Sequence, residues 1–562
     1  ESKRSGFRPP SPRCARRSRP YMGLLDSKYD SPAPPSSWFC SRLPISWRRW
    51  LSVAAAGISV FTMGGLCFGF DSIYPVLYSS GAFVDYCPAE QAAICSARTD
   101  EQRWLSCCDS QVSAIVSVTS VSLFGADGVM VLYGELTDRL GPRWCMSVAL
   151  SLAYLGIMLL AIAGWLGAAA SDALWYFAFP MLGLAGPGIF MAVLSFGEVF
   201  PRLEPVITPL AASMFDGSAF VFLFWKLLFL HAHVPLFVIA AAWLLLTVAV
   251  GGLAWSLLLS KRKTDAMRAE HEARSSELAP VSGMAQAPAI VWHSEGDGLR
   301  QLFCRTDTVL LLLFMCTANL NQTFYIETFA DQIRALGASA AMLPERAEEI
   351  VELFDVIFPL LSLGTTPLAI FLVNRYNARE HVYLGVVVGL SCLFGLAQLI
   401  PFHGPQLAAA ILFGPARTLQ WACYFHYLAS PSRYPPSAMG RMVGYANLLI
   451  ACFGDMPPYL LNTYIQHGTL PADKSSRYVA AHAALMVVVA HLSVALPLQL
   501  YASHRSASNR LLQNRAISSA DLSETLEELP SKSEGDDQSG CEEVSAACED
   551  GKSSARPDWI EV

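Results

Sequence analysis

The amino-acid sequence predicts an all-α integral membrane protein with twelve membrane-spanning helices arranged in two six-helix bundles. The 562-residue chain is 53% hydrophobic and only 15% charged, whereas soluble proteins carry about 25% charged residues. The charges concentrate near the two ends and in one central segment. This leaves apolar runs long enough to cross a bilayer, since a helical span needs about 20 residues. The lipid bilayer is therefore the expected environment of most of the chain.

The apolar runs fall into two sets of six on either side of a polar segment at 261–305. In the first bundle, 50–260, helices are expected near 50–72, 111–134, 143–166, 173–199, 205–230 and 235–260. In the second bundle, 306–501, they are expected near 306–330, 349–373, 381–401, 406–429, 441–465 and 478–501. The intervening cytoplasmic linker opens with Lys261-Arg262-Lys263. Six helices, a basic linker and six more helices are the layout expected of a two-halved transporter.

The distribution of Lys and Arg predicts the orientation, because these residues are retained on the cytoplasmic side. The basic segment 1–49 alone contains eleven of the 39 Lys and Arg residues. Both termini are therefore predicted to be cytoplasmic, in a multi-pass protein of the plasma membrane. Segment 1–49 lacks the apolar core of a cleavable signal peptide, so the first helix is expected to act as the signal. The acidic tail 502–562 is expected to be disordered, because it is rich in Ser, Asp and Glu.

Four cysteines lie in the predicted outer loop between the first two helices. They are Cys87, Cys95, Cys107 and Cys108. A loop that faces an oxidising compartment and holds four cysteines is expected to form one or two disulfides. Free thiols are the alternative, and of the possible pairings the one between the adjacent Cys107 and Cys108 is the least favoured.

The stretch from Gly134 to Arg143 is interpreted as a tight charged turn between the second and third helices. Gly134 permits close helix approach, as small residues do in membranes. Asp138 can face the N-terminus of a neighbouring helix, where the helix dipole favours an anion. Arg139 and Arg143 are expected to hold the turn at the cytoplasmic surface, and Pro142 suits the first turn of the next helix.

This stretch matches the pattern G-x-L-x-D-R-x-G-x-R at every fixed position, Gly141 included. It resembles the signature loop between helices 2 and 3 of the major facilitator superfamily. The resemblance implies the major facilitator fold, and a loop that latches the two halves in an outward-open state. Asp127, seven residues before the stretch, is assigned to the same gating network. The second half has no clean copy of the motif, and 374–379 occupies its place.

Within that superfamily, two further stretches resemble the large-neutral-amino-acid facilitator family and the apicomplexan amino acid transporters. The first is Gly69-Phe70-Asp71-Ser72-Ile73-Tyr74-Pro75-Val76-Leu77, which precedes the cysteine-bearing loop. The second is Met214-Phe215-Asp216-Gly217-Ser218-Ala219 in the fifth helix. The resemblance implies amino acid transport without ATP, mostly by facilitated diffusion or exchange.

Three ionisable residues are predicted near the middle of the bilayer, where a charge costs at least about 2.5–3.5 kcal/mol. Asp216 lies in the fifth helix, Arg417 in the tenth and Asp455 in the eleventh. In one interpretation Arg417 pairs with Asp455 or Asp216 and stabilises the fold. In the other, a carboxylate binds the amino group of a substrate and Arg417 binds its carboxylate.

Amides cluster in the seventh helix, at Asn319, Asn321 and Gln322. Asn319 and Asn321 are predicted to bind the backbone of an amino acid, with hydrogen bonding between helices as the alternative. Other carboxylates, such as Asp71 and Glu327, lie nearer outer helix ends, where they can reach water. The excess of carboxylates within helices suits a cationic amino acid or proton coupling, and the family resemblance suits a large neutral or aromatic one.

We therefore expect a monomeric amino acid transporter that works by alternating access, with no cofactor, no metal and no nucleic acid partner. A transporter of another small organic solute is the first alternative, and a membrane receptor or scaffold is the second. The sequence contains no H-E-x-x-H, no phosphate-binding Gly loop with Lys and no G-x-S-x-G, so an enzyme is not predicted.

Overall fold

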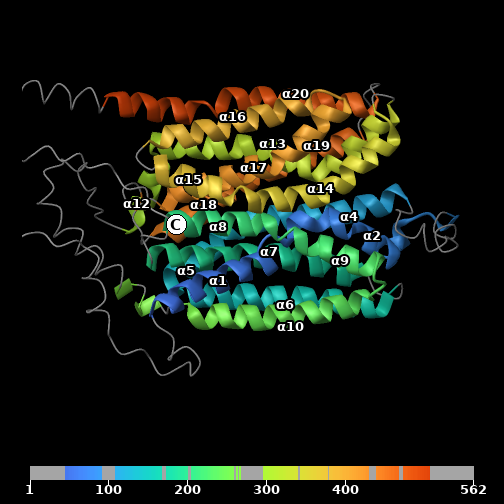
Figure 1. The fold of residues 1–562 in the computed structure, drawn as a ribbon, viewed down its shortest axis with the longest axis horizontal. Coiled ribbons are helices and arrows are strands. Elements are labelled where there is room, and N and C mark those ends of the chain that lie inside the picture. Colours follow the sequence, from blue (N-terminus) through green and yellow to red (C-terminus); the bar gives the residue numbers. More distant parts are fainter. Residues whose placement is uncertain are drawn as a thin grey trace, which may run out of the picture. The chain divides into compact units, whose positions relative to one another are not determined.

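A computed structural model shows a bundle of nearly parallel helices (Figure 1). It describes residues 45–90, 108–167, 172–199, 204–258, 261–263, 265–266, 295–339, 342–376, 379–429, 434, 438–467 and 473–506. No strand occurs in these ranges. Most of segment 1–49, most of the linker and nearly all of the tail lie outside them, as do Cys95 and Cys107.

The first half of the chain contains helices α1 to α10. Their bounds are α1 Ile45–Met63, α2 Phe70–Ser79, α4 Asp109–Gly128, α5 Met130–Leu140, α6 Pro142–Leu166, α7 Asp172–Val199, α8 Glu204–Gly217, α9 Phe220–Leu230 and α10 Leu236–Leu257, with short 3₁₀ turns η1 at Leu66–Gly69 and η2 at Val84–Tyr86.

The second half of the chain begins with a short helix inside the predicted linker. The bounds are α12 Glu295–Phe303, α13 Thr306–Ala338, α14 Pro344–Gly364, α15 Thr366–Tyr376, α16 Glu380–Gln398, α17 His403–Ala429, α18 Met439–Ile450, the π-helical turn η7 Ala451–Asp455, α19 Met456–His467 and α20 Lys474–Leu492.

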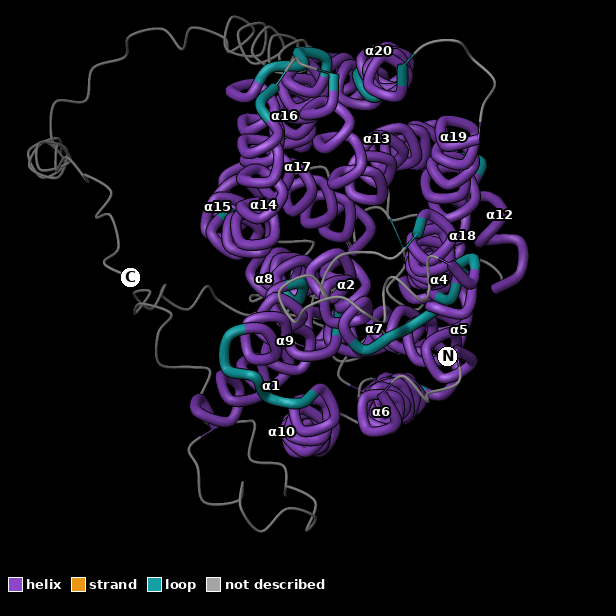
Figure 2. Tube along the Cα trace, turned by 90° about the vertical axis from the view of Figure 1, so that its right-hand side faces the viewer, coloured by secondary structure: helices purple, strands orange, loops and turns teal. Residues whose placement is uncertain are grey.

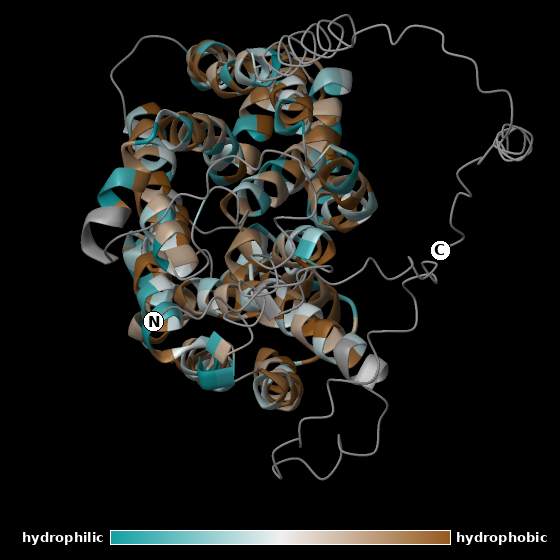
Figure 3. Cartoon of the chain, turned by 90° about the vertical axis from the view of Figure 1, so that its left-hand side faces the viewer, coloured by the Kyte–Doolittle hydropathy of each residue, from teal (hydrophilic) through white to brown (hydrophobic). Residues whose placement is uncertain are grey.

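Nine helices in the described ranges are long and apolar enough to cross a membrane, and ten if α1 and α2 count as one bent span. The remaining two predicted spans correspond to α17 and to α18, η7 and α19. These helices carry more polar residues, and α17 is buried over most of its length. Helices at the periphery, such as α10, instead expose apolar side chains including Leu245, and apolar residues dominate most of the helices (Figure 3).

Several predicted helix bounds were wrong. The first helix does not end at residue 72 but bends by 45° near Gly64 and continues to Ser79. The bend lies where neighbouring backbones come very close, and a Cβ on Gly65 would overlap the carbonyl oxygen of Phe215. Only glycine fits there, and the backbone N–H of Gly65 donates a hydrogen bond to Ser218 Oγ at 2.8 Å. The seventh helix is also longer than predicted, because α13 reaches Ala338.

The stretch from Gly134 to Arg143 is mostly helical, which corrects its interpretation as a turn. Residues up to Leu140 complete α5, and Pro142 begins α6. The chain reverses at Gly141 alone, with φ = 95°, a conformation that favours glycine. We call the end of the bundle that carries Gly141 the inner end.

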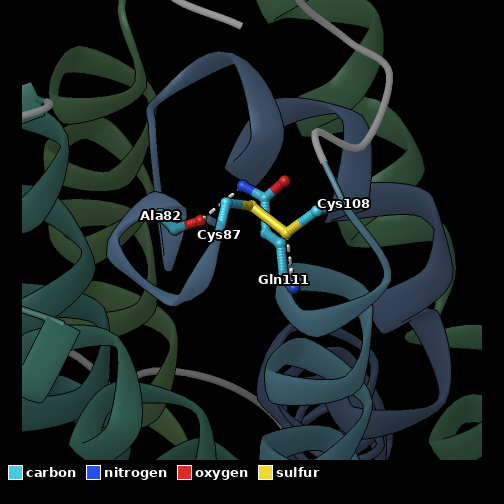
Figure 4. The surroundings of a disulfide bond; sticks show 4 residues. All are labelled: Ala82, Cys87, Cys108 and Gln111. Atoms are coloured by element: carbon cyan, nitrogen blue, oxygen red, sulfur yellow. Dashed lines mark hydrogen bonds between the residues drawn. A yellow bond between two sulfur atoms is a disulfide. The ribbon is translucent and has the colours of Figure 1, made fainter. Parts of the chain in front are cut away.

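A disulfide between Cys87 and Cys108 marks the opposite end, which we call the outer end. It joins the loop after α2 to the start of α4 (Figure 4). Gln111 supports the same junction, because its side-chain amide donates a hydrogen bond to the carbonyl of Ala82 at 2.7 Å. The prediction of a disulfide in this loop is confirmed.

Viewed along the helices, α1 to α10 form one group and α13 to α20 another, apart from α18, which lies against α4 and α5 (Figure 2). Helix α6 packs on α7 and α10 within the first group, and α17 packs on α14 and α16 within the second. The groups meet along two seams, α4 and α5 against α18 and η7, and α8 and α9 against α14, α15 and α17. These seams position the candidate functional residues.

Candidate functional site

A buried ion pair joins the two groups near the middle of the bundle. Arg417 Nε lies 3.1 Å from Asp216 Oδ1, and both side chains are only 3% exposed. Thr418 Oγ1 donates to the other oxygen, Oδ2, at 3.2 Å. Asp216 is the last residue but one of α8, and Arg417 follows Gly414-Pro415 in α17. A Cβ on Gly414 would be 2.9 Å from the carbonyl oxygen of Phe358 in α14. Close packing at this glycine sets the position of α17.

The guanidinium group of Arg417 retains an open donor. Its Nη1 atom is buried and meets no hydrogen-bond acceptor among the described residues. The group lies over the ring of Phe68, 4.1 Å from the ring centroid, and near the ring of Trp421 at 5.7 Å. Such cation–π contacts hold a desolvated guanidinium in place. The pair can therefore offer one unsatisfied donor to an anionic group of a ligand.

Asp455 lies on the other seam, at the end of the π-helical turn η7. Its Oδ1 atom accepts hydrogen bonds from Asn319 Nδ2 at 2.5 Å and from Thr323 Oγ1 at 2.9 Å. Both donors belong to α13, and Asp455 is 4% exposed. A π-turn within an α-helix often marks a functional position. Of the two pairings predicted for Arg417, the structure has the one with Asp216.

Asp127 of α4 faces Asp455 across the boundary between the two groups, with the two carboxyl groups within hydrogen-bonding reach. It was assigned to the gating network of Asp138. Eleven residues separate the two positions, about 16 Å along a helix. The structure thus places Asp127 beside the central carboxylate Asp455, on the seam that also carries Asp138, and its assignment to the gating network stays a prediction.

The predicted amides of α13 divide between two sides of the helix. Asn319 reaches Asp455, but the amide nitrogen of Asn321 faces Gly395 of α16. The side chain of Gln322 donates a hydrogen bond to Gln420 Oε1 at 2.9 Å. The structure therefore does not bring Asn321 together with Asn319, and the assignment of Asn321 to a substrate site stays a prediction without geometric support.

A latch joins the groups at the inner end. Asp138 accepts hydrogen bonds from the backbone N–H groups of Gly440 at 3.2 Å and Arg441 at 2.9 Å, at the start of α18. Arg441 Nε adds a charged contact at 3.3 Å. Asp138 thus faces a helix N-terminus as predicted. A Cβ on Gly134 would overlap the carbonyl oxygen of Gly440, so this glycine is what allows α5 and α18 to touch.

The basic residues of the motif have separate partners. Arg139 pairs with Glu135 within α5 at 2.7 Å and is mostly exposed. Arg143 Nε donates to the carbonyl of Leu258 at 2.6 Å, which ties α6 to the end of α10. Lys261 Nζ donates to the last carbonyls of α5, including that of Arg139 at 2.6 Å. The linker that Lys261 opens thereby caps the motif helix.

Sequence reasoning missed two contacts at the inner end that join the groups. The first involves Arg441, and a signal was present: a cation in the first turn of a helix is unfavourable without an acidic partner. The second contact is between His426 Nδ1 in α17 and Glu204 Oε1 in α8, 3.0 Å apart. Nothing in the local sequence points to this pair, because 222 residues separate its members.

A small cavity of about 20 Å³ lies between η1, α2, α4 and α13. Two acids, Asp71 of α2 and Glu327 of α13, line it together with Phe68 and Tyr74. Beyond it, Lys226 of α9 pairs with an acid of α14, Asp355, at 2.8 Å. No group of three or more His, Cys, Asp or Glu in the described ranges is arranged to hold a metal ion.

Two groups of apolar helices, joined by buried charged contacts at their boundary, define a multi-pass membrane protein. No protein-family model matches the chain. Protein FMP42 of Saccharomyces cerevisiae is 22% identical over 408 residues, which are 63% of this chain and 76% of that protein. Amino acid transporter 6-1 of Toxoplasma gondii is 24% identical over 182 residues, 32% of this chain and 31% of that protein.

Solved structures match over most of the chain. The human organic anion transporter MFSD10 (TETRAN) matches with a TM-score of 0.50 and 13% sequence identity, over 80% of this chain and 100% of that one. The major facilitator superfamily proton:xylose symporter XylE matches with a TM-score of 0.49 and 14% identity, over 79% of this chain and 95% of that one. The chain has the major facilitator fold, which confirms the predicted fold class.

Proposed function

We propose that this protein transports amino acids across a membrane by alternating access of its two helix groups. The buried Arg417–Asp216 pair carries the proposal, because it joins the groups near the middle of the bundle and leaves Nη1 of Arg417 without an acceptor among the described residues. A site at the midplane between two halves is the arrangement that alternating access requires.

An amino acid carries the two charges that this pair can exchange. Its carboxylate would bind the guanidinium of Arg417, and its ammonium group would bind Asp216. The substrate would then replace the direct contact between the two residues, which are 3.1 Å apart. Burial strengthens both interactions, since a charge-assisted hydrogen bond gains when water is excluded.

This conformation suits loading from the outer end. The latch of Asp138 closes α5 onto α18 at the inner end, while the cavity with Asp71 and Glu327 lies on the outer side of Arg417. Phe68 links the two regions, because its ring both lines the cavity and contacts the guanidinium group. With the predicted orientation, both termini are cytoplasmic and the outer end faces outside the cell, at the plasma membrane.

Two acids and three aromatic residues around one cavity favour a cationic amino acid over a large neutral one. Asp71 and Glu327 attract a positive side chain, and Phe68 and Tyr74 offer ring faces to it. The similarity to an amino acid transporter of Toxoplasma gondii supports the substrate class. Another small organic solute is the second candidate, and the organic anion transporter among the structural neighbours supports it through the fold alone.

The test is uptake of a labelled amino acid panel by cells that express the full chain. We expect uptake of arginine or lysine above that of control cells, and loss of at least about 90% of it in Asp216→Asn and Arg417→Ala. Arg346→Ala is the matched control, because Arg346 is exposed and pairs with Glu349 in the next helical turn. Surface expression is measured for each variant.

Uptake indistinguishable from that of control cells for every amino acid would refute the proposed substrate class. Normal uptake by both central variants would remove the ion pair from the site. If neutral amino acids are carried and arginine and lysine are not, the cationic preference fails while amino acid transport stands.

A further inference from the structure

We infer that Asp127 and Asp455 form a proton-binding site that couples amino acid movement to a proton, an inference that rests on the proposed transport function. The two carboxyl groups come from different helix groups, α4 and η7, and are within hydrogen-bonding reach of each other. Neither residue is needed for the Arg417–Asp216 pair, so the site is separate from the proposed substrate contacts.

The hydrogen bonds of Asp455 show what the pair lacks. Its Oδ1 atom accepts bonds from Asn319 and Thr323. Its Oδ2 atom is buried and meets no donor among the described residues. An ionised carboxylate only accepts hydrogen bonds, so two such groups can bond to each other only if one of them carries a proton. One proton satisfies Oδ2 and removes the repulsion between the buried charge of Asp455 and the partly buried charge of Asp127.

Neighbouring ionisable groups on α13, α17 and η1 act on the charge of the pair. Arg417 of α17 is the cation nearest to Asp127, and Glu327 of α13 adds a further negative charge near Asp455. Cys316 of α13 and Tyr424 of α17 also lie close, as does Cys67 of η1. Because Arg417 is already paired with Asp216, the acid pair has no cation of its own among the described residues.

A route for the proton leads from the outer cavity. Glu327 lines that cavity and lies four residues after Thr323 in α13, on the same face of the helix. Thr323 in turn donates to Asp455. Glu327 therefore lies one helical turn from the hydroxyl group that contacts Asp455, which gives a proton a short path to the acid pair without crossing the inner latch.

The pair links proton binding to the conformational change because its members belong to opposite groups. While α4 and η7 are in contact, the two carboxyls hold one proton between them. When the groups separate at the inner end, the hydrogen bond between Asp127 and Asp455 breaks. The carboxyl group that held the proton then ionises and releases it to water on that side. One proton thus crosses with each inward cycle.

The experiment uses the purified full chain in proteoliposomes, with the membrane potential clamped by potassium and valinomycin. An acid-outside gradient of one pH unit should raise the final accumulation of a transported amino acid by about tenfold, as expected for one proton per substrate. A pH-sensitive dye in the lumen should report acidification when substrate is added without a gradient.

Asp127→Asn should abolish both the tenfold rise and the lumenal acidification. It should still exchange labelled substrate for unlabelled substrate trapped inside, which requires the substrate site alone. Glu348→Gln is the matched control, because Glu348 is an exposed acid paired with Arg334 at the outer end, and it should behave like the unaltered protein.

The outcomes separate this inference from the proposed function. Exchange and uptake by the unaltered protein with no response to the gradient and no acidification would overturn proton coupling and leave amino acid transport standing. Acidification retained by Asp127→Asn would overturn the assignment of the site. Absence of any amino acid movement in the unaltered protein would overturn the proposed function itself.

Discussion

Two side-chain pairs join the halves of this protein near the midplane, and they differ in the sign of their charges. On one seam, Asp216 of α8 meets Arg417 of α17, and opposite charges neutralise each other. On the other seam, Asp127 of α4 meets Asp455 of η7, and both groups are acids. The charges of the first pair balance with the side chains present. The second is complete only when a proton is bound.

The surroundings of the two pairs match this difference. Aromatic rings flank the guanidinium of Arg417, at 4.1 Å for Phe68 and 5.7 Å for Trp421. An amide and a hydroxyl, from Asn319 and Thr323, solvate Asp455 instead. An ion pair can be opened by a ligand with both charges, whereas an acid pair can be opened by loss of a proton. The contrast teaches that the two seams of one fold can carry pairs with different charge, which different ligands would open.

The largest expected effect distinguishes the pairs by stability. Asp216→Asn leaves the buried guanidinium of Arg417 without its counter-charge, which should cost about 3–5 kcal/mol. Asp127→Asn replaces one acid by an amide that can donate to Asp455, so its cost should be about 1 kcal/mol or less. The measurement is the midpoint temperature at which detergent-solubilised protein stops eluting as a folded species. Equal losses would show that the two pairs do not differ in charge state.

The disulfide should have a smaller effect that is confined to one half. Cys87 and Cys108 lie 21 residues apart and both belong to the first group of helices. Cys108→Ser should lower stability by about 2–4 kcal/mol, seen as a lower midpoint temperature, and a reducing agent should do the same to the unaltered protein. Because the bond does not cross between the halves, proton-driven accumulation at low temperature should persist. Loss of proton-driven accumulation in Cys108→Ser would show that the disulfide also affects the contacts between the two halves.

The smallest expected effect concerns the inner latch, which must open before either pair can separate. Asp138→Asn removes a charge that accepts hydrogen bonds from Gly440 and Arg441. Hydrogen bonds to a charged group contribute about 1.5–3 kcal/mol, so the initial uptake rate per surface molecule should fall by about tenfold or more. Arg375→Ala, at the corresponding place in the second half, should stay within about twofold, because Arg375 is exposed and contacts a neighbouring ring. A larger loss in Arg375→Ala would indicate a second latch.

Much of the architecture could be predicted because it depends on local chemistry. Apolar runs of about 20 residues predict helices wherever they occur, and the stretch from Gly134 to Arg143 is enough by its residue pattern to indicate the fold. The close approach at Gly134 and the helix N-terminus opposite Asp138 were also expected, since both follow from the properties of a single residue. The errors in helix bounds were small and confined to a few positions. The bend near Gly64, for example, lies where Gly65 contacts Phe215 and Ser218 of another segment, which the local sequence does not indicate.

What the sequence could not supply is which residue meets which across the boundary. Asp216 and Asp455 were equivalent partners for Arg417 on depth alone, and the contact of Asp127 with Asp455 was not predicted. Depth follows from position along one helix, but a contact also depends on the rotation and tilt of two helices, and Arg417 and Asp216 are 201 residues apart. The sequence alone therefore predicted a helical membrane protein with charged residues near the middle of its helices. The division of its charges into an ion pair and an acid pair depends on tertiary packing, because packing alone decides which buried charge faces which.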